Sequence, residues 1–279
     1  MASDPDADRV GAAVKNNEGE WVLLNGNQTA LMFVYYLITR WKELGKINGK
    51  EYIVKTIVTT ETIKTIAERN GVEMYDVYTG FKWIANVMRE NEGKKNYIGG
   101  GEESYGFLCE DFVRDKDAVS ACVILAEIAA WAKDQGLSLY QLLQKIYVEY
   151  GFSKEKGISV VKKGKSGAEE IEAMMKKFRE NPLTEIAGSK VTYFYDYSTL
   201  KGKDYAENET VTLDMPTTSN VLQYFTEDNT KVSIRPSGTE PKIKFYCEVH
   251  SKVKNIDELP EAEKAAEEKI NQIKASLGI

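Results

Sequence analysis

The order of apolar segments changes once along the chain, and this change limits the available folds more than any other feature. Between residues 21 and 150, short apolar strands alternate with amphipathic helices, whereas between residues 190 and 249 strands follow one another through short turns. The first pattern predicts a largely parallel sheet with helices on both faces, and the second predicts an antiparallel sheet. We therefore expect an α/β protein: a three-layer α/β/α domain with a mixed, largely parallel sheet, then a small α+β domain with an antiparallel sheet and a C-terminal helix.

Residues 19–152 are predicted to form the α/β/α domain. The strands expected there are Trp21–Leu24, Tyr52–Val58, Val72–Tyr78 and Asn96–Gly99. The helices expected there are one between the N-cap candidate Asn25 and Gly45, then Thr60–Asn70, Phe81–Glu90, Ala118–Lys133 and Ser138–Tyr150. In sheets of this kind, ligands bind beyond the C-terminal ends of the strands, so we expect the site in the loops that follow them.

Residues 188–279 are predicted to form the α+β domain, after a hinge and connecting helix at residues 153–187. The helix Ala168–Arg179 stops before Pro182, and the lysines ahead of it are interpreted as a solvated face. Those lysines are Lys162, Lys163 and Lys165. The strands expected next are Lys190–Tyr195, Thr210–Leu213, Asn220–Thr226, Lys231–Ile234 and Lys242–Val249, and the last helix is Glu261–Leu277.

Charge and composition exclude several classes of protein. The net charge of −6 argues against broad nucleic-acid binding, which needs a basic face to displace counterions. No run of about 18 apolar residues is present to span a membrane, and the acidic start Met1–Asp8 is unlike a signal peptide. The three cysteines show no metal-ligand spacing, which favours reduced thiols in a cytoplasmic protein. The only histidine, His250, is interpreted as a satisfied side chain rather than a catalytic base.

Residues 235–242 read Arg-Pro-Ser-Gly-Thr-Glu-Pro-Lys and connect two segments with strand alternation. The Arg235 guanidinium can hold two phosphate oxygens, and Lys242 adds a second cation. Hydroxyl groups of Ser237 and Thr239 can donate to the same anion, while Gly238 lets backbone N–H groups approach it closely. The pattern therefore indicates a phosphate clamp; the alternative is a stiff hairpin turn with solvated charges.

Three carboxylates stand at alternate positions near the start of the chain, at Asp4, Asp6 and Asp8. Carboxylates with this spacing can converge on one hard cation such as Mg²⁺. A helix–loop–helix calcium site is excluded, because Arg9 and Lys15 stand where that loop needs glycine and glutamate. The alternatives are a solvated acidic terminus and a phosphatase with Asp4 or Asp6 as nucleophile, which lacks the apolar strand expected ahead of the loop.

Two of the predicted strands end in polar loops, at residues 79–83 and 99–106. In the second loop, three glycines permit close backbone approach, and Glu102 with Ser104 suits a pair of vicinal sugar hydroxyls. The alternative is a glycine-rich turn with exposed acids. Further on, Asp117 is expected to cap the long apolar helix that follows residues 114–117, Arg-Asp-Lys-Asp.

These motifs, in this order, resemble those of the α-D-phosphohexomutases, the phosphoglucomutase/phosphomannomutase family. The resemblance involves Asp-Pro-Asp-Ala-Asp-Arg at residues 4–9, Gly-Glu-Glu-Ser-Tyr-Gly at 101–106 and the 235–242 stretch. It implies Mg²⁺ on Asp4, Asp6 and Asp8, and a phosphate clamp at residues 235–242. It also implies that Glu102 and Ser104 hold the hexose 3- and 4-hydroxyls. Thr79 and Gly80 resemble another substrate loop, and the implied catalytic candidates are Lys116, Arg9 and Lys82.

The resemblance further implies an enzyme that moves phosphate between O1 and O6 of a hexose through a phosphoserine and a bisphosphorylated sugar. The family's serine loop is not found, and residues 1–18 resemble the end of a preceding domain. We therefore expect the C-terminal half of a mutase, inactive alone, whose partners are a hexose phosphate and the missing N-terminal domains. Glucose is favoured over mannose by residues 102–105 and 114–117. The alternative is a non-catalytic phosphosugar-binding module.

Overall fold

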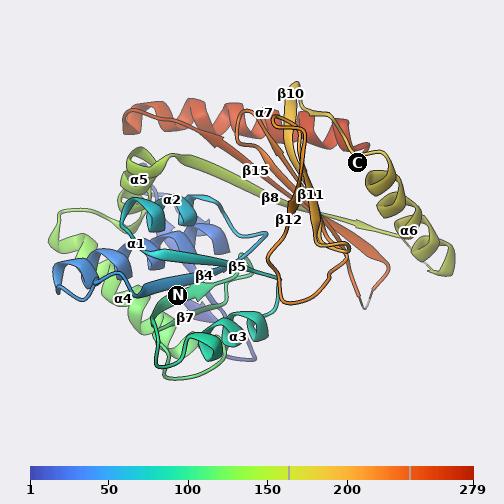
Figure 1. Cartoon of the computed structure of the whole chain (residues 1–279). Coiled ribbons are helices and arrows are strands. Elements are labelled where there is room, and N and C mark those ends of the chain that lie inside the picture. The colour runs from blue at the N-terminus through green and yellow to red at the C-terminus, as the bar shows by residue number, and fades with distance from the viewer. Residues whose placement is uncertain (163, 239) are drawn as a thin grey trace. The chain divides into compact units, whose positions relative to one another are not determined.

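The computed structural model describes residues 1–162, 164–238 and 240–279, and the chain divides into two compact units (Figure 1). Unit 1 consists of Met1–Phe152 with Val253–Ile256. Unit 2 consists of Ser153–Lys252 with Asp257–Ile279. Among the described residues, no helix has both the length and the apolar character needed to cross a membrane.

Unit 1 alternates strands with helices over most of its length. Its strands are β1 (Ala2–Ser3), β2 (Val10–Lys15), β3 (Trp21–Leu24), β4 (Glu51–Thr56), β5 (Glu73–Val77), β6 (Asn96–Gly101) and β7 (Phe107–Cys109). Its helices are α1 (Gly26–Glu43), α2 (Thr62–Arg69), α3 (Phe81–Asn91), α4 (Ala118–Asp134) and α5 (Leu139–Tyr150). The predicted alternation is confirmed.

The main sheet of unit 1 has the strand order β5-β4-β6-β7. The β4–β5 and β4–β6 pairs are parallel and the β6–β7 pair is antiparallel, so the sheet is mixed and largely parallel, as predicted. On one face, Tyr52 and Val54 of β4 pack with Phe81, Ile84 and Met88 of α3. Since side chains alternate along a strand, Ile53 faces the opposite layer, where α1 and α2 lie (Figure 1). The result is a three-layer α/β/α arrangement.

A separate antiparallel sheet, β1-β2-β3, contains the start of the chain. Strands β2 and β3 form a hairpin in which Ala12 pairs with Leu24 and Lys15 pairs with Trp21. This hairpin spans residue 18, where the sequence placed the end of a remnant domain. Trp21–Leu24 therefore pairs with the start of the chain and not with the parallel sheet.

Local capping chemistry sets the starts of three helices in unit 1. Asn25 caps α1 and Ser138 caps α5, each through a capping box in which the side chain accepts a backbone N–H and a glutamine returns the bond. Asp117 caps α4 by accepting from the N–H groups of Val119 and Ser120, as expected from the sequence. These caps fix the ends of the helices that surround the polar loops.

The described residues of unit 2 form strands, two α-helices and a short 3₁₀ turn. Its strands are β8 (Phe152–Val161), β9 (Glu185–Ile186), β10 (Ser189–Asp196), β11 (Lys201–Asp204), β12 (Glu209–Thr212), β13 (Leu222–Thr226), β14 (Lys231–Pro236) and β15 (Lys242–Ser251). Its helices are α6 (Gly164–Glu180), the short 3₁₀ turn η1 (Ile256–Glu258) and α7 (Leu259–Leu277).

The sheet of unit 2 has the order β12-β11-β10-β13-β14-β15-β8, with β9 beside β10. All strand pairs from β9 to β15 are antiparallel, which confirms the predicted α+β fold. Helices α6 and α7 pack on this sheet; for example, the rings of Phe178 on α6 and Phe245 on β15 meet edge to face at 6.3 Å between centroids. The amphipathic helix α7 buries Leu259, Ala266 and Ile270 at helical spacing.

Three strands of unit 2 were not predicted as such, of which the two-residue strand β9 is the shortest. Strand β11 has the sequence Lys-Gly-Lys-Asp, which carries no apolar alternation, and it pairs between β10 and β12. Strand β8 occupies ten residues, most of them where the sequence predicted the start of a hinge, and it joins the sheet beside β15. The sheet is therefore wider than the pattern of apolar residues suggested.

Candidate substrate and phosphate-binding sites

The loop between β6 and β7, residues 102–106, is folded against a neighbouring loop of unit 1. Glu102 is 6% exposed, and its Oε1 accepts a hydrogen bond of 2.7 Å from the Gly80 N–H. The Glu102 N–H donates to the Gly106 carbonyl at 2.9 Å, which closes the loop. The structure thus brings together Glu102 and Gly80, two residues that the sequence assigned to sugar binding, while Ser104 and Thr79 are half-buried nearby in the chain.

The next residue, Glu103, anchors the loop to β4 and to the turn after it. Its carboxylate accepts hydrogen bonds from the hydroxyls of Thr56 at 3.2 Å and Thr59 at 3.4 Å, and its N–H donates to Thr59 Oγ1 at 3.2 Å. On the other side, a Cβ placed on Gly26 would overlap the Glu103 carbonyl oxygen. The start of α1 therefore packs directly against the loop backbone, and only glycine fits there.

The strand that leads into this loop ends in Gly99, Gly100 and Gly101. A Cβ on Gly100 would overlap the Val54 carbonyl oxygen, and one on Gly101 would lie 2.5 Å from Phe107 Cδ2. Close contact with neighbouring backbone and rings thus requires glycine at positions 100 and 101, while a Cβ on Gly99 would be crowded at 3.1 Å from Leu37 Cδ1. The sequence predicted close approach by a ligand, whereas the structure assigns the glycines to packing within the unit.

The acidic loop, residues 4–9, is a tight turn in which Ala7 has a positive φ of 56°. Asp4 Oδ1 accepts from the N–H groups of Asp8 and Arg9, both at 3.1 Å. Partial burial raises the pKa of Asp4, but these backbone hydrogen bonds outweigh it and hold the pKa below the usual value. Asp6 is exposed. Asp4 is therefore ionised and turned toward its own loop.

Asp8 forms an ion pair with Lys116, whose Nζ lies 2.8 Å from Asp8 Oδ2. The Lys116 side chain is 13% exposed, and its Nζ also lies 3.3 Å from Asp115 Oδ1. Burial lowers the pKa of Lys116, but the Asp8 and Asp115 carboxylates outweigh it and hold the pKa above its ordinary value. The two carboxylates therefore favour Lys116 as a protonated hydrogen-bond donor over Lys116 as a base.

Lys116 and the acidic loop both touch the sugar loop. The Val10 N–H donates to the Tyr105 carbonyl at 3.1 Å, and Arg9 forms a β-bridge with Gly106. A Cβ on Gly106 would lie 2.5 Å from Lys116 Cδ and 3.6 Å from Glu102 Oε2. Three segments that are far apart in the sequence, residues 4–9, 102–106 and 116, are therefore neighbours within unit 1.

The residue types of the acidic loop suit Mg²⁺, but their side chains do not converge on one point in this structure. Within the described part of the chain, no group of three or more His, Cys, Asp or Glu side chains is close enough to hold a metal ion. However, Asp8 Oδ1 is buried and has no hydrogen-bond partner in that part, an acceptor that a cation would satisfy. Carboxylate oxygens are also the donors that Mg²⁺ prefers.

A buried lysine that the sequence analysis did not single out supports both substrate loops. Lys55 on β4 is fully buried, and its Nζ lies 2.6 Å from Asp76 Oδ1, 2.9 Å from Glu61 Oε1 and 3.4 Å from the Thr59 carbonyl. Asp76 lies opposite Lys55 in the β4–β5 register and precedes the loop of Thr79 by three residues. Thr59 binds Glu103, so one ammonium group braces the bases of both loops.

In unit 2, the predicted clamp is the connection of the β14–β15 hairpin. Strand pairing continues to Pro236 opposite Ile243, and the Ser237 N–H then donates to the Lys242 carbonyl at 2.8 Å. The Glu240 N–H donates to Ser237 Oγ at 3.3 Å. Thr239 lies outside the described residues. A Cβ on Gly238 would meet no heavy atom within 4 Å, so packing does not require glycine there.

The hairpin presents cations on one face. Arg235 lies directly opposite Lys244, and Lys242 shares that face because it is two residues before Lys244 on the strand. Lys242 forms an ion pair with Glu240, and this contact holds the pKa of Glu240 below its usual value. Within the described residues, neither Arg235 nor Lys244 makes an ion pair. Like charges opposite each other destabilise a sheet, so this pair suits an anion. The sequence analysis missed Lys244, although its spacing from Lys242 could have indicated it.

One candidate for catalysis, Lys82, does not join the cluster around Lys116, whereas Arg9 joins it through its backbone bridge to Gly106. The Lys82 ammonium lies over the ring of its neighbour Trp83, 5.1 Å from the centroid. Arg9 is exposed, and its Nε lies 3.8 Å from Asp8 Oδ1. The only histidine, His250, has its Nε2 2.8 Å from Glu248 Oε1, but this buried Nε2 has no hydrogen bond of good geometry within the described residues, so a satisfied side chain stays a prediction.

Comparison with protein families gives the class of this protein. The model of the phosphoglucomutase/phosphomannomutase α/β/α domain III matches residues 25–150, and that of the phosphoglucomutase/phosphomannomutase C-terminal domain matches residues 159–266. The two models follow each other in the order of the two architectures described above. The chain therefore belongs to the phosphoglucomutase/phosphomannomutase family, as the resemblance predicted.

Within this family, the chain is similar to curated phosphoglucomutases of staphylococci. It is 38% identical over 259 residues to the phosphoglucomutase of Staphylococcus aureus strain USA300, covering 93% of this chain and 46% of that protein. It is 33% identical over 250 residues to the phosphoglucomutase of Staphylococcus haemolyticus strain JCSC1435. The chain thus spans about half the length of the curated relatives it matches.

Solved structures agree on the fold. The open form of pp63/parafusin, a phosphoglucomutase from Paramecium, superposes with a TM-score of 0.58 at 17% identity, over 97% of this chain and 44% of that one. A phosphoglucomutase/phosphomannomutase family protein from Burkholderia thailandensis gives a TM-score of 0.58 at 17% identity, over 99% of this chain and 46% of that one. At these identities the likeness establishes the fold alone.

Proposed function

We propose that this chain is the sugar- and phosphate-binding half of a phosphohexomutase that interconverts hexose 1-phosphate and hexose 6-phosphate. The observation that carries the proposal is the cluster in unit 1, where the acidic loop, Lys116 and the Glu102 loop meet. Phosphoryl transfer needs positioning and stabilisation of charge more than covalent chemistry, and this cluster combines polar sugar ligands with a held cation.

The roles follow from the contacts. The Glu102 carboxylate accepts hydrogen bonds from sugar hydroxyls and is already oriented by Gly80, with Ser104 and Thr79 completing the hydroxyl contacts. Lys116, protonated beside Asp8, donates a proton or a charge-assisted hydrogen bond to the oxygen that loses the phosphoryl group. Asp4, Asp6 and Asp8 are the residues that would hold Mg²⁺, which when bound supplies positive charge beside the moving phosphoryl group.

The clamp in unit 2 binds the phosphate that does not react. Arg235 grips two of its oxygens, while Lys244 and Lys242 add point charges, and Ser237 with the backbone near Gly238 contributes N–H or O–H donors. A site made of charges and flexible donors accepts a phosphate attached to either end of the sugar. Thr239 belongs to the same proposal on sequence grounds alone.

The remaining elements of the proposal concern the complete protein. Transfer through a phosphoserine and a bisphosphorylated sugar requires a serine loop, so we expect this chain alone to bind substrate without converting it. We favour glucose over mannose phosphates, since the curated relatives named above are phosphoglucomutases. We also propose a cytoplasmic location, which is supported by the free thiols of Cys109, Cys122 and Cys247.

The test separates binding from turnover. Calorimetry of the chain should detect glucose 1-phosphate, with weaker binding of mannose 1-phosphate and a loss of about tenfold in Glu102→Gln, as expected for one charged hydrogen bond. An assay for glucose 6-phosphate should show no conversion. Turnover at the rate of a complete mutase would overturn the division of labour, and absence of binding by both sugars would sink the proposal itself.

A further inference from the structure

A hollow of about 410 Å³ lies on the outer side of α3, away from the residues assigned to the sugar. We name it the α3 hollow. Its lining consists of Lys82, Ala85, Asn86, Arg89, Glu92 and Arg114. A volume of this size falls within the range of about 300–1,000 Å³ that is typical of sites for small molecules.

The charge of the α3 hollow is opposite in sign to that of the chain. Lys82, Arg89 and Arg114 are cationic and Glu92 is the only acid in the lining, in a protein whose net charge is −6. Glu92 forms an ion pair with Arg114, and the Arg114 guanidinium lies 3.2 Å from the Glu92 carboxylate. Within the described residues, Lys82 and Arg89 form no ion pair. The hollow therefore has two cations left for an external anion.

The three residues from α3 follow helical spacing. Lys82, Asn86 and Arg89 stand at i, i+4 and i+7, so they share one face of the helix, and Lys82 and Arg89 are separated by about 10 Å along its axis. Asn86 lies between them and donates its amide to Glu90 at 2.8 Å, which orients its carbonyl oxygen. Lys82 and Arg89 thus lie at the two ends of this helix face, and the carbonyl oxygen of Asn86 lies between them as a hydrogen-bond acceptor.

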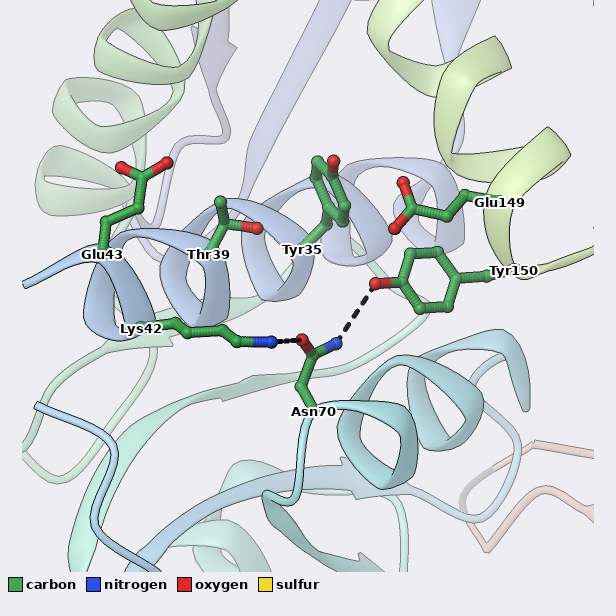
Figure 2. Close-up of a pocket in the computed structure, with 7 residues that line it drawn as sticks. All are labelled: Tyr35, Thr39, Lys42, Glu43, Asn70, Glu149 and Tyr150. Carbon is green, nitrogen blue, oxygen red and sulfur yellow. Dashed lines mark hydrogen bonds between the residues drawn. The ribbon is translucent and has the colours of Figure 1, made fainter. Parts of the chain in front are cut away.

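A second hollow in unit 1 lies between α1, α2 and α5, and several of its lining side chains form hydrogen bonds with one another (Figure 2). There Lys42 donates to Asn70 Oδ1 at 3.3 Å, and the Asn70 amide donates to the Tyr150 hydroxyl at 3.1 Å. Glu43 on its rim pairs with Arg40. The groups in this hollow largely bind one another, whereas the cations of the α3 hollow do not.

We propose that the α3 hollow binds a small molecule with two anionic groups separated by an uncharged, hydroxylated spacer, for which a bisphosphorylated polyol is the best match. Each anionic group pairs with one end of this helix face, at Lys82 and at Arg89 with Arg114, and Asn86 accepts from a hydroxyl between them. An acidic polymer suits the site less well, because the rest of this acidic chain would repel it. This site is additional to the mutase site and does not depend on it.

The test uses calorimetry of the whole chain with fructose 1,6-bisphosphate as the probe. Because the proposed clamp would also bind the probe, the measurements are made in an Arg235→Ala background, where binding at the clamp is about tenfold weaker and the tighter event reports the α3 hollow. Adding Arg89→Ala should weaken that event at least tenfold, and the event should weaken steeply as salt rises. The matched control is Lys64→Ala, which removes an exposed cation from the neighbouring helix α2 and should leave affinity unchanged.

Two outcomes would overturn the inference. The first is equal affinity in the Arg89→Ala and Lys64→Ala chains, which would show that the hollow does not bind the probe. The second is inorganic phosphate binding at the α3 hollow as tightly as the bisphosphate, which would contradict recognition of two groups. Circular dichroism melting of each variant checks the fold, and Asn86→Ala gives an independent probe, with an expected loss of several-fold.

Discussion

The sugar loop of unit 1 and the clamp loop of unit 2 are built in opposite ways. The sugar loop is held from outside: Glu102 bonds to Gly80, Glu103 bonds to Thr56 and Thr59, and α1 packs beneath it at Gly26. The clamp loop is held from inside, through the contacts among residues 237, 240 and 242 and through the hairpin it closes.

Stability and binding are therefore coupled to different degrees in the two loops. When the hydrogen-bond partners of a loop belong to other helices and strands, a substitution in the loop also destabilises the core, and a substitution in the core also displaces the loop. A loop that depends on a hairpin alone can lose a side chain without loss of fold. Substitutions around the sugar loop should therefore affect both stability and affinity, whereas substitutions in the clamp should affect affinity alone.

The largest effect is expected from Lys55→Met. Removing the ammonium leaves Asp76 and Glu61 without their buried partner, and breaking such a pair costs about 3 kcal/mol of unfolding free energy. Sugar affinity should fall with it, since both substrate loops rest on this lysine. All four tryptophans, Trp21, Trp41, Trp83 and Trp131, lie in unit 1, so their fluorescence during urea unfolding reports this unit.

The control for this substitution is Lys64→Met, at an exposed lysine of α2 whose ion pair spans 3.9 Å. Exposed pairs of this kind contribute about 0–1 kcal/mol, so little change is expected. If both variants unfold at the same urea concentration, Lys55 does not brace the loops.

The next effect compares two glycines, Gly26, which packs against the sugar loop, and Gly238, which lies within the clamp loop. In Gly26→Ala, the new methyl group overlaps the Glu103 carbonyl, and we expect about 1–3 kcal/mol of destabilisation together with weaker hexose binding. In Gly238→Ala, the methyl group meets open space, so stability should stay unchanged. Urea unfolding and calorimetry of both variants measure the contrast, and equal destabilisation would remove the proposed difference between the loops.

A smaller effect is expected from Arg235→Ala in the clamp. Affinity for inorganic phosphate and glucose 1-phosphate should fall about tenfold, equivalent to about 1.4 kcal/mol, because one fork of charged hydrogen bonds is lost. The melting temperature should stay within about one degree, since Arg235 makes no ion pair within the described residues. Unchanged phosphate affinity by calorimetry would remove the clamp assignment.

The smallest effect concerns pH. Burial raises the pKa of Glu51, but hydrogen bonds from the Asn48 and Gly49 N–H groups and from the Asn96 amide outweigh it and hold the pKa below the usual value. A depressed pKa stabilises the folded state above the unfolded pKa of about 4.5, and this contribution disappears as pH falls through the folded pKa. Tryptophan-detected stability should therefore decline below about pH 4.5, less steeply in Glu51→Gln. Parallel pH profiles would contradict this account.

The sequence predicted the fold class and the family because both depend on local patterns. Alternation of strands with helices and the turn residues of the 235–242 hairpin are visible within short windows. Strand β11 was missed because a Lys-Gly-Lys-Asp segment becomes a strand only through its neighbours in the sheet. The apolar pattern therefore shows which residues are buried, but not how many strands share a sheet.

The parts of the candidate site that escaped prediction depend on pairing over long distances. Lys55 meets Asp76 because the two are opposite in a parallel register, which the sequence leaves open. Lys116 meets Asp8 across more than a hundred residues, and this contact helps to hold the pKa of Lys116 above its ordinary value. The sequence identified side chains that are able to bind or catalyse, and the structure identified which of them form ion pairs with one another.

The three glycines that end β6 carry a consequence for variation. A Cβ at Gly100 or Gly101 would overlap Val54 or Phe107, whereas one at Gly99 would only crowd Leu37 and Leu108. In a saturation library selected for hexose binding, positions 100 and 101 should therefore keep glycine, while position 238 should vary freely. Such a result would distinguish the positions that the fold requires, at the end of β6, from the positions in the clamp loop at which new specificities can be selected.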